Sequence, residues 1–425
     1  MCPRQISPGQ RTSTVESEAS PFRRRTNWRL SLAGSRLSFL VIYLDSNATS
    51  PVDPQVLEAM LPFLRELFAN PGASYRPARQ VQKAVRTARA QVAGLLDVSD
   101  EEIIFTSGGT ESNNTAIEAA RMFWPRRKHL VIGATEHPAV LEPAKRWEKD
   151  GGSVTIVPVQ ADGVISLDAL REAVRPDETA LVSVMWANNE TGVIAPIEAI
   201  GHIARSAGAL MHTDAVQAVG KLGISLRSLP IDYLSLSGHK FHAPKGVGAL
   251  YVSKHARFRP LLLGGGQEGG RRSGTENVPG IVALGAAAAM APADPSLIAA
   301  MRDDFEARVR TALPDTVMNG HPWQRLPGTT NLCFPGLSAV EMLILLDDRG
   351  VCCAAGSACH TAHVHPSPVL EAMGFDAAHA AGSLRFSFSR LNTIKEAAEA
   401  TAHVVAVAGR LRQFQGDGSS PVILG

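Results

Sequence analysis

Cysteine and lysine are both scarce in this sequence. Its 425 residues include five cysteines, which are irregularly spaced and form no CxxC pair. This pattern argues against a disulfide framework and against a cysteine-rich zinc site, and it indicates a reducing compartment with reactive rather than structural thiols. Lysine accounts for nine of the 42 basic residues, so a lysine inside a polar motif is not explained by abundance.

Long apolar stretches and an excess of one charge are also missing. No apolar run approaches the roughly 18 residues that a membrane-spanning helix needs, and "LSFLVIYL" has only eight. The formal net charge is +2 and the pI is about 8.3. The sequence therefore predicts no membrane partner and no nucleic-acid partner, and it favours a cytoplasmic location.

Residues 1–40 contain no lysine and only two acidic residues, Glu16 and Glu18, but they include seven arginines and seven serines. This composition is typical of an organelle transit peptide, which would place the protein in an organelle matrix. A disordered leader, or a start codon assigned too early, is the alternative interpretation. In either case we expect the fold to begin near Val41.

Strand-like and helix-like segments alternate from about residue 54 to residue 292. This alternation predicts an α/β domain over residues 41–292, with a mainly parallel seven-stranded sheet covered by helices on both faces. "PADPS" then marks a boundary, and residues 293–412 are interpreted as a small α+β domain, followed by a tail, 413–425. An alternative assignment places the first residues of the large domain in the small domain. The seven apolar runs are "EIIFTS", "HLVIGA", "VTIVPV", "ALVSVM", "ALMHTD", "DYLSLS" and "VGALYVS".

Polar residues follow several of these runs, and in an open α/β sheet ligands bind at the carboxyl ends of the strands. A glycine pair followed by Thr110 at a helix start offers free backbone N–H groups and a hydroxyl, which suit a phosphate. His137, Asp214 and Lys240 each follow another run, with Gln217 one turn after Asp214. An ordinary glycine turn, a capped turn at His137, a helix cap at Asp214 and a surface lysine are the alternatives.

As a set, these residues match the requirements of pyridoxal phosphate. The cofactor needs a lysine for its Schiff base, a carboxylate that keeps the pyridine nitrogen protonated, a side chain that stacks on the ring and a phosphate site. Lys240, Asp214, His137 and the segment around Thr110 would fill these roles.

The motifs resemble those of the cysteine desulfurase and selenocysteine lyase group, within the class V aminotransferase family of fold-type I pyridoxal phosphate enzymes. The resemblance extends from about Tyr43 to about Arg412. It implies a fold-type I transferase with a large cofactor domain, a small C-terminal α+β domain and a homodimer. The motifs are "YLDSNATSP", "NPGASY", "FTSGGTESNN", "EHPAV", "ANNETG", "HTDAVQAVGK", "SLSGHKFHAPKGVGALY", "GGGQEGGRRSGTENVP" and "SLRFSFSR".

The resemblance also implies a role for each matching residue. Lys240 would form the Schiff base and move the substrate's α proton, His137 would stack on the ring, and Asp214 would pair with the pyridine nitrogen. Gln217 would reach the phenolic oxygen. The phosphate would be held by Gly109, Thr110, Ser237 and His239, together with Thr275 of the other subunit. Asn47, Asn189 and Arg385 would bind the substrate, with Asn189 also next to the cofactor; a salt bridge at a strand start is the alternative for Arg385.

The stretch "VCCAAGSACHTAHVHPSPVL" holds three of the five cysteines and three of the 13 histidines. In the family, the cysteine of "GSAC" accepts the substrate sulfur, and it corresponds to Cys359. We interpret Cys352 and Cys353 as packed side chains. For the neighbouring histidines we consider a metal site, a role in lowering the pKa of Cys359, and a solvated loop; a bound metal would block the nucleophile, so we predict none. The histidines are His360, His363 and His365.

The resemblance implies a reaction that converts L-cysteine to L-alanine and leaves the sulfur on Cys359 as a persulfide. An acceptor protein would then take the sulfur for iron–sulfur clusters or thiolated cofactors. Tyr75, Pro138 and His360 stand where many desulfurases have His, Lys and Thr, and His360 favours the selenocysteine lyase pattern. Two alternatives therefore remain: a selenocysteine lyase that releases selenide and L-alanine, and a non-catalytic scaffold for sulfur-transfer proteins.

Overall fold

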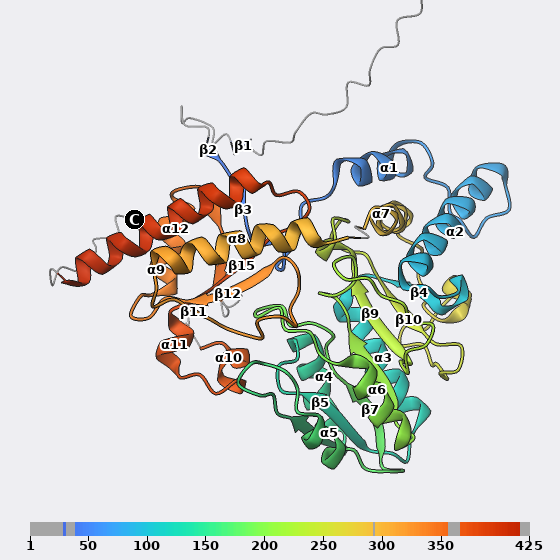
Figure 1. The fold of residues 1–425 in the computed structure, drawn as a ribbon. Helices are drawn as coiled ribbons and strands as arrows, with labels where there is room; N and C mark the ends of the chain where they lie inside the picture. The colour runs from blue at the N-terminus through green and yellow to red at the C-terminus, as the bar shows by residue number, and fades with distance from the viewer. Residues whose placement is uncertain (1–28, 31–38, 292–293, 356–365, 417–425) are drawn as a thin grey trace, which may run out of the picture. The chain divides into compact units, whose positions relative to one another are not determined.

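The computed structural model describes residues 29–30, 39–291, 294–355 and 366–416 (Figure 1). The chain divides into two compact units, Met1–Val41 and Ile42–Gly425. In the first unit, β1 (Arg29–Leu30) pairs with β2 (Phe39–Leu40) in antiparallel orientation. The second unit contains all the other elements.

The larger sheet of the second unit has seven strands in the order β4-β10-β9-β8-β7-β5-β6. β10 is antiparallel to β4 and β9, and the remaining pairs are parallel. The mainly parallel seven-stranded sheet expected from the sequence is therefore confirmed. The strands are β4 (Ile103–Thr106), β5 (His129–Gly133), β6 (Ser153–Val157), β7 (Thr179–Ser183), β8 (Leu210–Asp214), β9 (Tyr233–Ser237) and β10 (Gly248–Val252).

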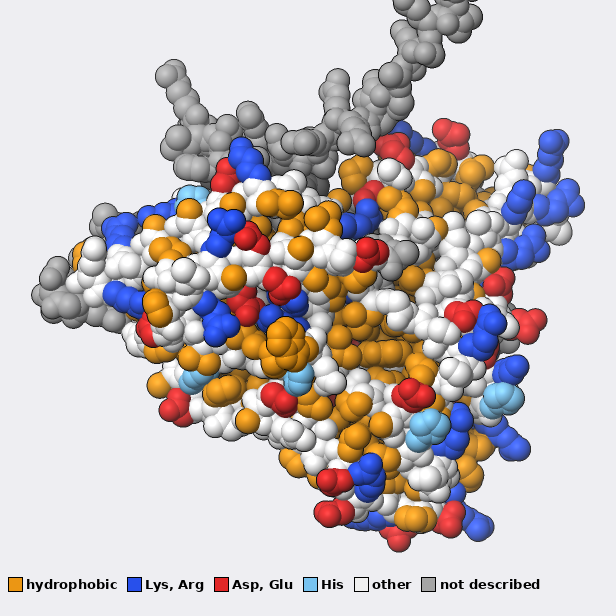
Figure 2. Space-filling view, in the orientation of Figure 1, with side chains coloured by type: hydrophobic (Ala, Val, Ile, Leu, Met, Phe, Trp, Pro, Cys, Tyr) orange, Lys and Arg blue, Asp and Glu red, His pale blue; other side chains and the backbone are white. Residues whose placement is uncertain are grey.

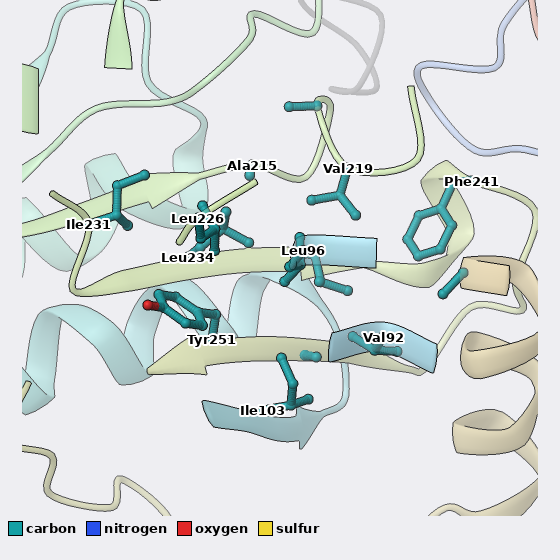
Figure 3. Packing of buried hydrophobic residues seen from close by; sticks show 14 of the residues in the cluster. Val92, Leu96, Ile103, Ala215, Val219, Leu226, Ile231, Leu234, Phe241 and Tyr251 are labelled. Atoms are coloured by element: carbon teal, nitrogen blue, oxygen red, sulfur yellow. The ribbon is translucent and has the colours of Figure 1, made fainter. Parts of the chain in front are cut away.

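Helices cover both faces of this sheet. Alternate strand residues point to opposite faces, and the apolar side chains on each face are buried under a layer of helices. Ile103 packs in one hydrophobic core with Val92 and Leu96 of α2 (Figure 3), whereas Ile104 packs in another core with residues of α3 and α4. The first layer contains α1 (Pro54–Arg65), α2 (Arg76–Leu96), α5 (Leu167–Ala173), α6 (Ile197–Ser206) and α7 (Val278–Ala289), and the second contains α3 (Gly109–Phe123) and α4 (Pro138–Lys149).

A second sheet of four antiparallel strands has the order β11-β12-β15-β14 and its own hydrophobic core. Ile42 and Leu44 belong to this core, and β3 (Ile42–Tyr43) pairs in parallel with β13 (Val351–Cys352). The domain boundary near residue 292 stays a prediction. The other elements are α8 (Ser296–Ala312), β11 (Val317–Met318), β12 (Thr329–Cys333), α9 (Ala339–Asp347), β14 (Ala354–Ala355), α10 (Pro368–Ala372), α11 (Ala377–Ala381), β15 (Ser383–Ser387) and α12 (Ile394–Gly416).

Charges of both signs are mixed over most of the face shown in Figure 2, although basic side chains gather where α2 lies. The exposed basic residues of that helix include Arg76, Arg79, Lys83 and Arg86. Among the helices of the described ranges, none combines the length and apolar character needed to span a bilayer.

Candidate active site

Lys240 lies at the carboxyl end of the large sheet. It ends the short 3₁₀ turn η2 (Gly238–Lys240), which follows β9 directly. Its Nζ donates hydrogen bonds to the carbonyl oxygens of Asn47 and Ala48, each at 2.8 Å. The side chain is half-buried, so the amine is held at a defined position at the sheet edge.

Asp214, the last residue of β8, is a buried carboxylate near this amine. Its Oδ1 accepts from the backbone N–H of Val216 at 3.0 Å, and its Oδ2 accepts from Nδ2 of Asn113 at 2.6 Å. Burial raises the pKa of the Asp214 carboxyl, while these bonds and the nearby His137 and Lys240 oppose the rise. A buried carboxylate of this kind is stabilised as an anion by a cationic partner, such as a protonated ring nitrogen.

His137 caps the start of α4, where its Nδ1 accepts from the backbone N–H of Ala139 at 3.1 Å. Burial lowers the pKa of the imidazole; Asp214 raises that pKa and Lys240 lowers it further. The ring is therefore neutral near pH 7, and a neutral aromatic ring fixed by a capping bond is suited to stacking on a planar ligand.

The glycine pair after β4 forms the N-terminus of α3. Gly108 has φ of 151°, and a Cβ added to Gly109 would lie 2.5 Å from Cγ2 of Val216. Within the described residues, the backbone N–H groups of Gly109, Thr110 and Glu111 have no hydrogen-bond partner. Unpaired N–H groups at the positive end of a helix dipole attract a phosphate.

Three further expected residues lie at or near the carboxyl edge of the large sheet: Gln217, Ser237 and His239. Gln217 and Ser237 are buried, and Nε2 of Gln217 donates to the carbonyl oxygen of Asn47 at 2.9 Å. His239 Nδ1 lies 3.1 Å from Oγ1 of Thr49. Burial, reinforced by Lys240 and other lysines, lowers the pKa of His239 to about 4.

These observations show that the residues fit pyridoxal phosphate. The unpaired N–H groups at the start of α3 suit its phosphate, the buried Asp214 suits its ring nitrogen, and the amine of Lys240 suits its aldehyde. The side chains come from the ends of β4, β5, β8 and β9, which parallel topology brings to one edge of the sheet.

Arg385 of β15 approaches this edge from the small sheet. Its Nη2 donates to Oδ1 of Asp45 at 2.5 Å, and its Nη1 donates to the carbonyl oxygen of Asn189 at 2.9 Å. Arg385 therefore forms an ion pair, as the alternative raised from the sequence has it, but in the middle of β15 rather than at its start. Asn47 Nδ2 also donates to the carbonyl oxygen of Asn189, at 3.1 Å, so the three expected substrate residues lie together.

The described structure does not join two of the expected site residues to this group. Thr275 is exposed, and its side chain has no hydrogen-bond partner in the part of the chain that the structure describes. Cys359 lies outside the described residues, as do His360, His363 and His365. In the described ranges, no cluster of three or more His, Cys, Asp or Glu side chains could hold a metal.

Cys352 and Cys353 are free, half-buried thiols. Cys353 packs against the core of the small sheet. Burial, together with Asp45, raises the pKa of the Cys353 thiol far above its usual value, so little thiolate forms there.

Sequence reasoning missed several polar contacts of the site. Asn113 holds Asp214, Asp45 holds Arg385, and Lys221 donates to both Asn47 and Gln217. The first two residues lie inside the quoted motifs "FTSGGTESNN" and "YLDSNATSP", but nothing in the spacing indicates their partners. For Lys221 a signal existed, because it lies four residues after Gln217 in a chain with few lysines.

The family model that describes the class V aminotransferases matches residues 42–399. The chain belongs to the aminotransferase class V family. The resemblance to its cysteine desulfurases is confirmed, and with it the fold-type I architecture and the dependence on pyridoxal phosphate.

Similar proteins are found among curated sequences and solved structures. A protein named cysteine desulfurase 2 from Trichormus variabilis is 49% identical over 375 residues, covering 88% of this chain and 94% of that protein. Cysteine desulfurase NifS from Azotobacter vinelandii is 43% identical over 388 residues, covering 90% and 96%. A solved NifS-like protein superposes with a TM-score of 0.81 and 36% identity, covering 87% of this chain and all of the other chain.

Proposed function

We propose that the chain is a cysteine desulfurase that converts L-cysteine to L-alanine and transfers the sulfur to Cys359. The observation that carries the proposal is the grouping of Lys240, Asp214 and His137 with the unpaired start of α3 at one sheet edge. The similarity to proteins named cysteine desulfurase supports the choice of substrate.

When bound, pyridoxal phosphate supplies an electron sink beside the substrate's Cα. Lys240 would anchor the cofactor and would then move the substrate's α proton, and Asp214 would keep the pyridine nitrogen charged. His137 would stack on the ring, and Gln217 would donate to the phenolic oxygen. The phosphate would be held by the N–H groups of Gly109 and Thr110, by Ser237 and His239, and by Thr275 of a second copy of the chain.

Arg385 binds the substrate carboxylate through its guanidinium, which forms paired hydrogen bonds to carboxylates. One of its nitrogens is held by Asp45 and another by the Asn189 carbonyl. These two contacts fix the plane of the guanidinium. Asn47 and Asn189 complete the wall on which the substrate lies.

Cys359 attacks the substrate sulfur as a thiolate. An S–S bond forms on Cys359, the Cβ–S bond of the substrate breaks, and Cβ takes up a proton, so that L-alanine and a persulfide result. An acceptor protein then removes the outer sulfur. This chemistry requires a free thiol, which is why we place the enzyme in a reducing compartment such as the cytoplasm.

Product analysis with and without reductant tests the proposal. Wild-type protein should form L-alanine from L-cysteine, and mass spectrometry should find one extra sulfur on the peptide that contains Cys359. Cys352→Ser and Cys353→Ser are matched controls that should keep most activity, whereas Cys359→Ala should bind cofactor but lose sulfur transfer. Selenide release without any alanine from cysteine would identify a selenocysteine lyase instead.

Borohydride reduction tests the cofactor anchor separately. It should fix pyridoxal phosphate covalently on the peptide that contains Lys240, and Lys240→Ala should carry no label. Labelling of another lysine in Lys240→Ala would show that the anchor is assigned wrongly.

A further inference from the structure

A second lysine amine lies beside Lys240, and the proposed reaction does not use it. Nζ of Lys221 donates to Oδ1 of Asn47 at 2.8 Å and to Oε1 of Gln217 at 2.6 Å. Asn47 and Gln217 are buried, and Lys221 itself is half-buried. Both lysines line one cavity of about 30 Å³, which has room for about two water molecules.

The two lysines share a residue. The carbonyl oxygen of Asn47 accepts from Nζ of Lys240 at 2.8 Å and from Nε2 of Gln217 at 2.9 Å, while the side-chain oxygen of the same residue accepts from Lys221. Lys221, Gln217, Asn47 and Lys240 thus form one connected hydrogen-bond network at the cofactor edge.

Lys221 and the Asn47 carbonyl together fix which way the Gln217 amide faces. Nζ of Lys221 donates to the amide oxygen at 2.6 Å, and the Asn47 carbonyl oxygen, which can only accept, receives a hydrogen bond from the amide nitrogen at 2.9 Å. The two ends of the amide are nearly equal in size, so these contacts hold its orientation. Lys221 is the partner of Oε1 in the described chain, and its removal would leave the orientation to the Asn47 carbonyl alone.

The charge environment of Lys221 differs from that of a surface lysine. Within the described residues no carboxylate forms an ion pair with it; its partners are two neutral amides. Burial lowers the pKa of its amine well below the usual value, and the cations Lys240 and Arg385 lower it further. The position of this amine is therefore fixed by its hydrogen bonds to the two amide oxygens and not by an ion pair.

We propose that Lys221 is a positioning residue of the reaction, which orients the Gln217 amide so that its nitrogen donates to the phenolic oxygen of the cofactor bound at Lys240. This inference rests on the proposed function. A fixed donor would stabilise negative charge on the phenolic oxygen, so the Lys240 nitrogen, once joined to the cofactor, would hold its proton less strongly. Lys221 would therefore act through Gln217 on the protonation of the Lys240 nitrogen.

A spectroscopic titration of the holoenzyme tests this role. In Lys221→Met, which keeps the length of the side chain but cannot donate, the pH midpoint of the cofactor's visible absorption should rise by about one unit, the size of one net hydrogen bond. Lys221→Gln keeps an N–H donor and should restore part of the shift. Lys254→Met replaces an exposed lysine that takes no part in the network of Lys221, Gln217, Asn47 and Lys240, and it should leave the midpoint unchanged.

A titration of the wild-type holoenzyme with ¹³C-labelled lysine gives a second measurement that does not depend on folding of a variant. The chain has nine lysines, and one amine other than Lys240 should titrate well below the exposed ones. An unchanged absorption midpoint in Lys221→Met, or ordinary titration of every free amine, overturns the inference. Failure of the wild type to bind the cofactor would instead overturn the proposed function.

Discussion

Glu190 illustrates how a single residue joins segments that are far apart in the sequence. It lies in the "ANNETG" segment next to Asn189, and its Oε2 accepts a hydrogen bond from Oγ of Ser367 at 2.5 Å. Ser367 also caps α10 by accepting from the backbone N–H of Leu370. Burial raises the pKa of the Glu190 carboxyl to about 7, although the Ser367 bond and Arg385 lower it. Glu190 is therefore an ionisable link between the substrate wall and the start of α10.

This pKa predicts a pH dependence of stability. The folded pKa of about 7 lies above the ordinary value of 4.5, so between these pH values the unfolded chain loses a proton that the folded chain keeps, and stability falls as pH rises. Glu190→Gln removes this loss. Relative to wild type, the variant should gain up to about 3 kcal/mol on going from pH 4.5 to pH 8.

Urea denaturation at pH 5 and pH 8 measures this effect. The midpoint of Glu190→Gln should change less between the two pH values than that of wild type. Glu148→Gln, at an exposed position of α4, serves as the control and should follow wild type. Equal displacement of the Glu190→Gln midpoint at both pH values would contradict the assignment.

Among the elements, the start of α3 depends on close contact with its neighbours. A Cβ on Gly109 would lie 2.5 Å from Cγ2 of Val216, and a Cβ on Gly248 of β10 would lie 2.7 Å from Cα of Gly108. The helix N-terminus is therefore fitted between the end of β8 and the start of β10. The close contacts at Gly109 and Gly248 leave no room for an added side chain at either position.

Gly109→Ala should consequently cost roughly 1–3 kcal/mol of stability, as overpacking of a closed site does, and should lower cofactor retention. Gly94→Ala is the matched control. Gly94 lies in α2, is exposed and would meet nothing within 4 Å, so alanine there should stabilise the helix by about 1 kcal/mol. Thermal unfolding and the cofactor content of purified protein measure both effects; normal cofactor content in Gly109→Ala would contradict the expectation.

The elements could be predicted from the sequence because each carries a local pattern. The apolar runs bounded by polar motifs predicted the seven strands. The alternation of these strands with helices predicted a mainly parallel sheet, and therefore a cofactor site at the carboxyl ends of its strands. The antiparallel direction of β10 was not predicted, although residues 238–247 are too few for the crossover that a parallel strand requires. The contact between Asp45 and Arg385 joins residues 340 positions apart, and no local pattern specifies such a pair.

At the scale of the whole molecule, the segment between β10 and α7 contains an exposed run of three leucines, Leu261–Leu263. Leu263 is 83% exposed, and Leu262 and Leu261 are also exposed. Phe68, after α1, is likewise 83% exposed. An exposed apolar run of this kind marks an association site. It lies in the same segment as Thr275, so a second copy of the chain that covers it would also receive Thr275.

A mixed dimer tests whether Thr275 acts across the interface. Lys240→Ala lacks the anchor, and Thr275→Glu places a carboxylate where the phosphate of the other subunit should bind, so each variant alone should be inactive. In a mixed dimer, the intact Lys240 of one subunit meets the intact Thr275 of its partner, which restores one of the two sites. Equal mixing of dissociated subunits should therefore recover about a quarter of wild-type activity, because half of the dimers are mixed.

Light scattering must show a dimer of the full chain. A monomer with full cofactor content, or mixing that restores nothing although mixed dimers form, would contradict a site shared between subunits.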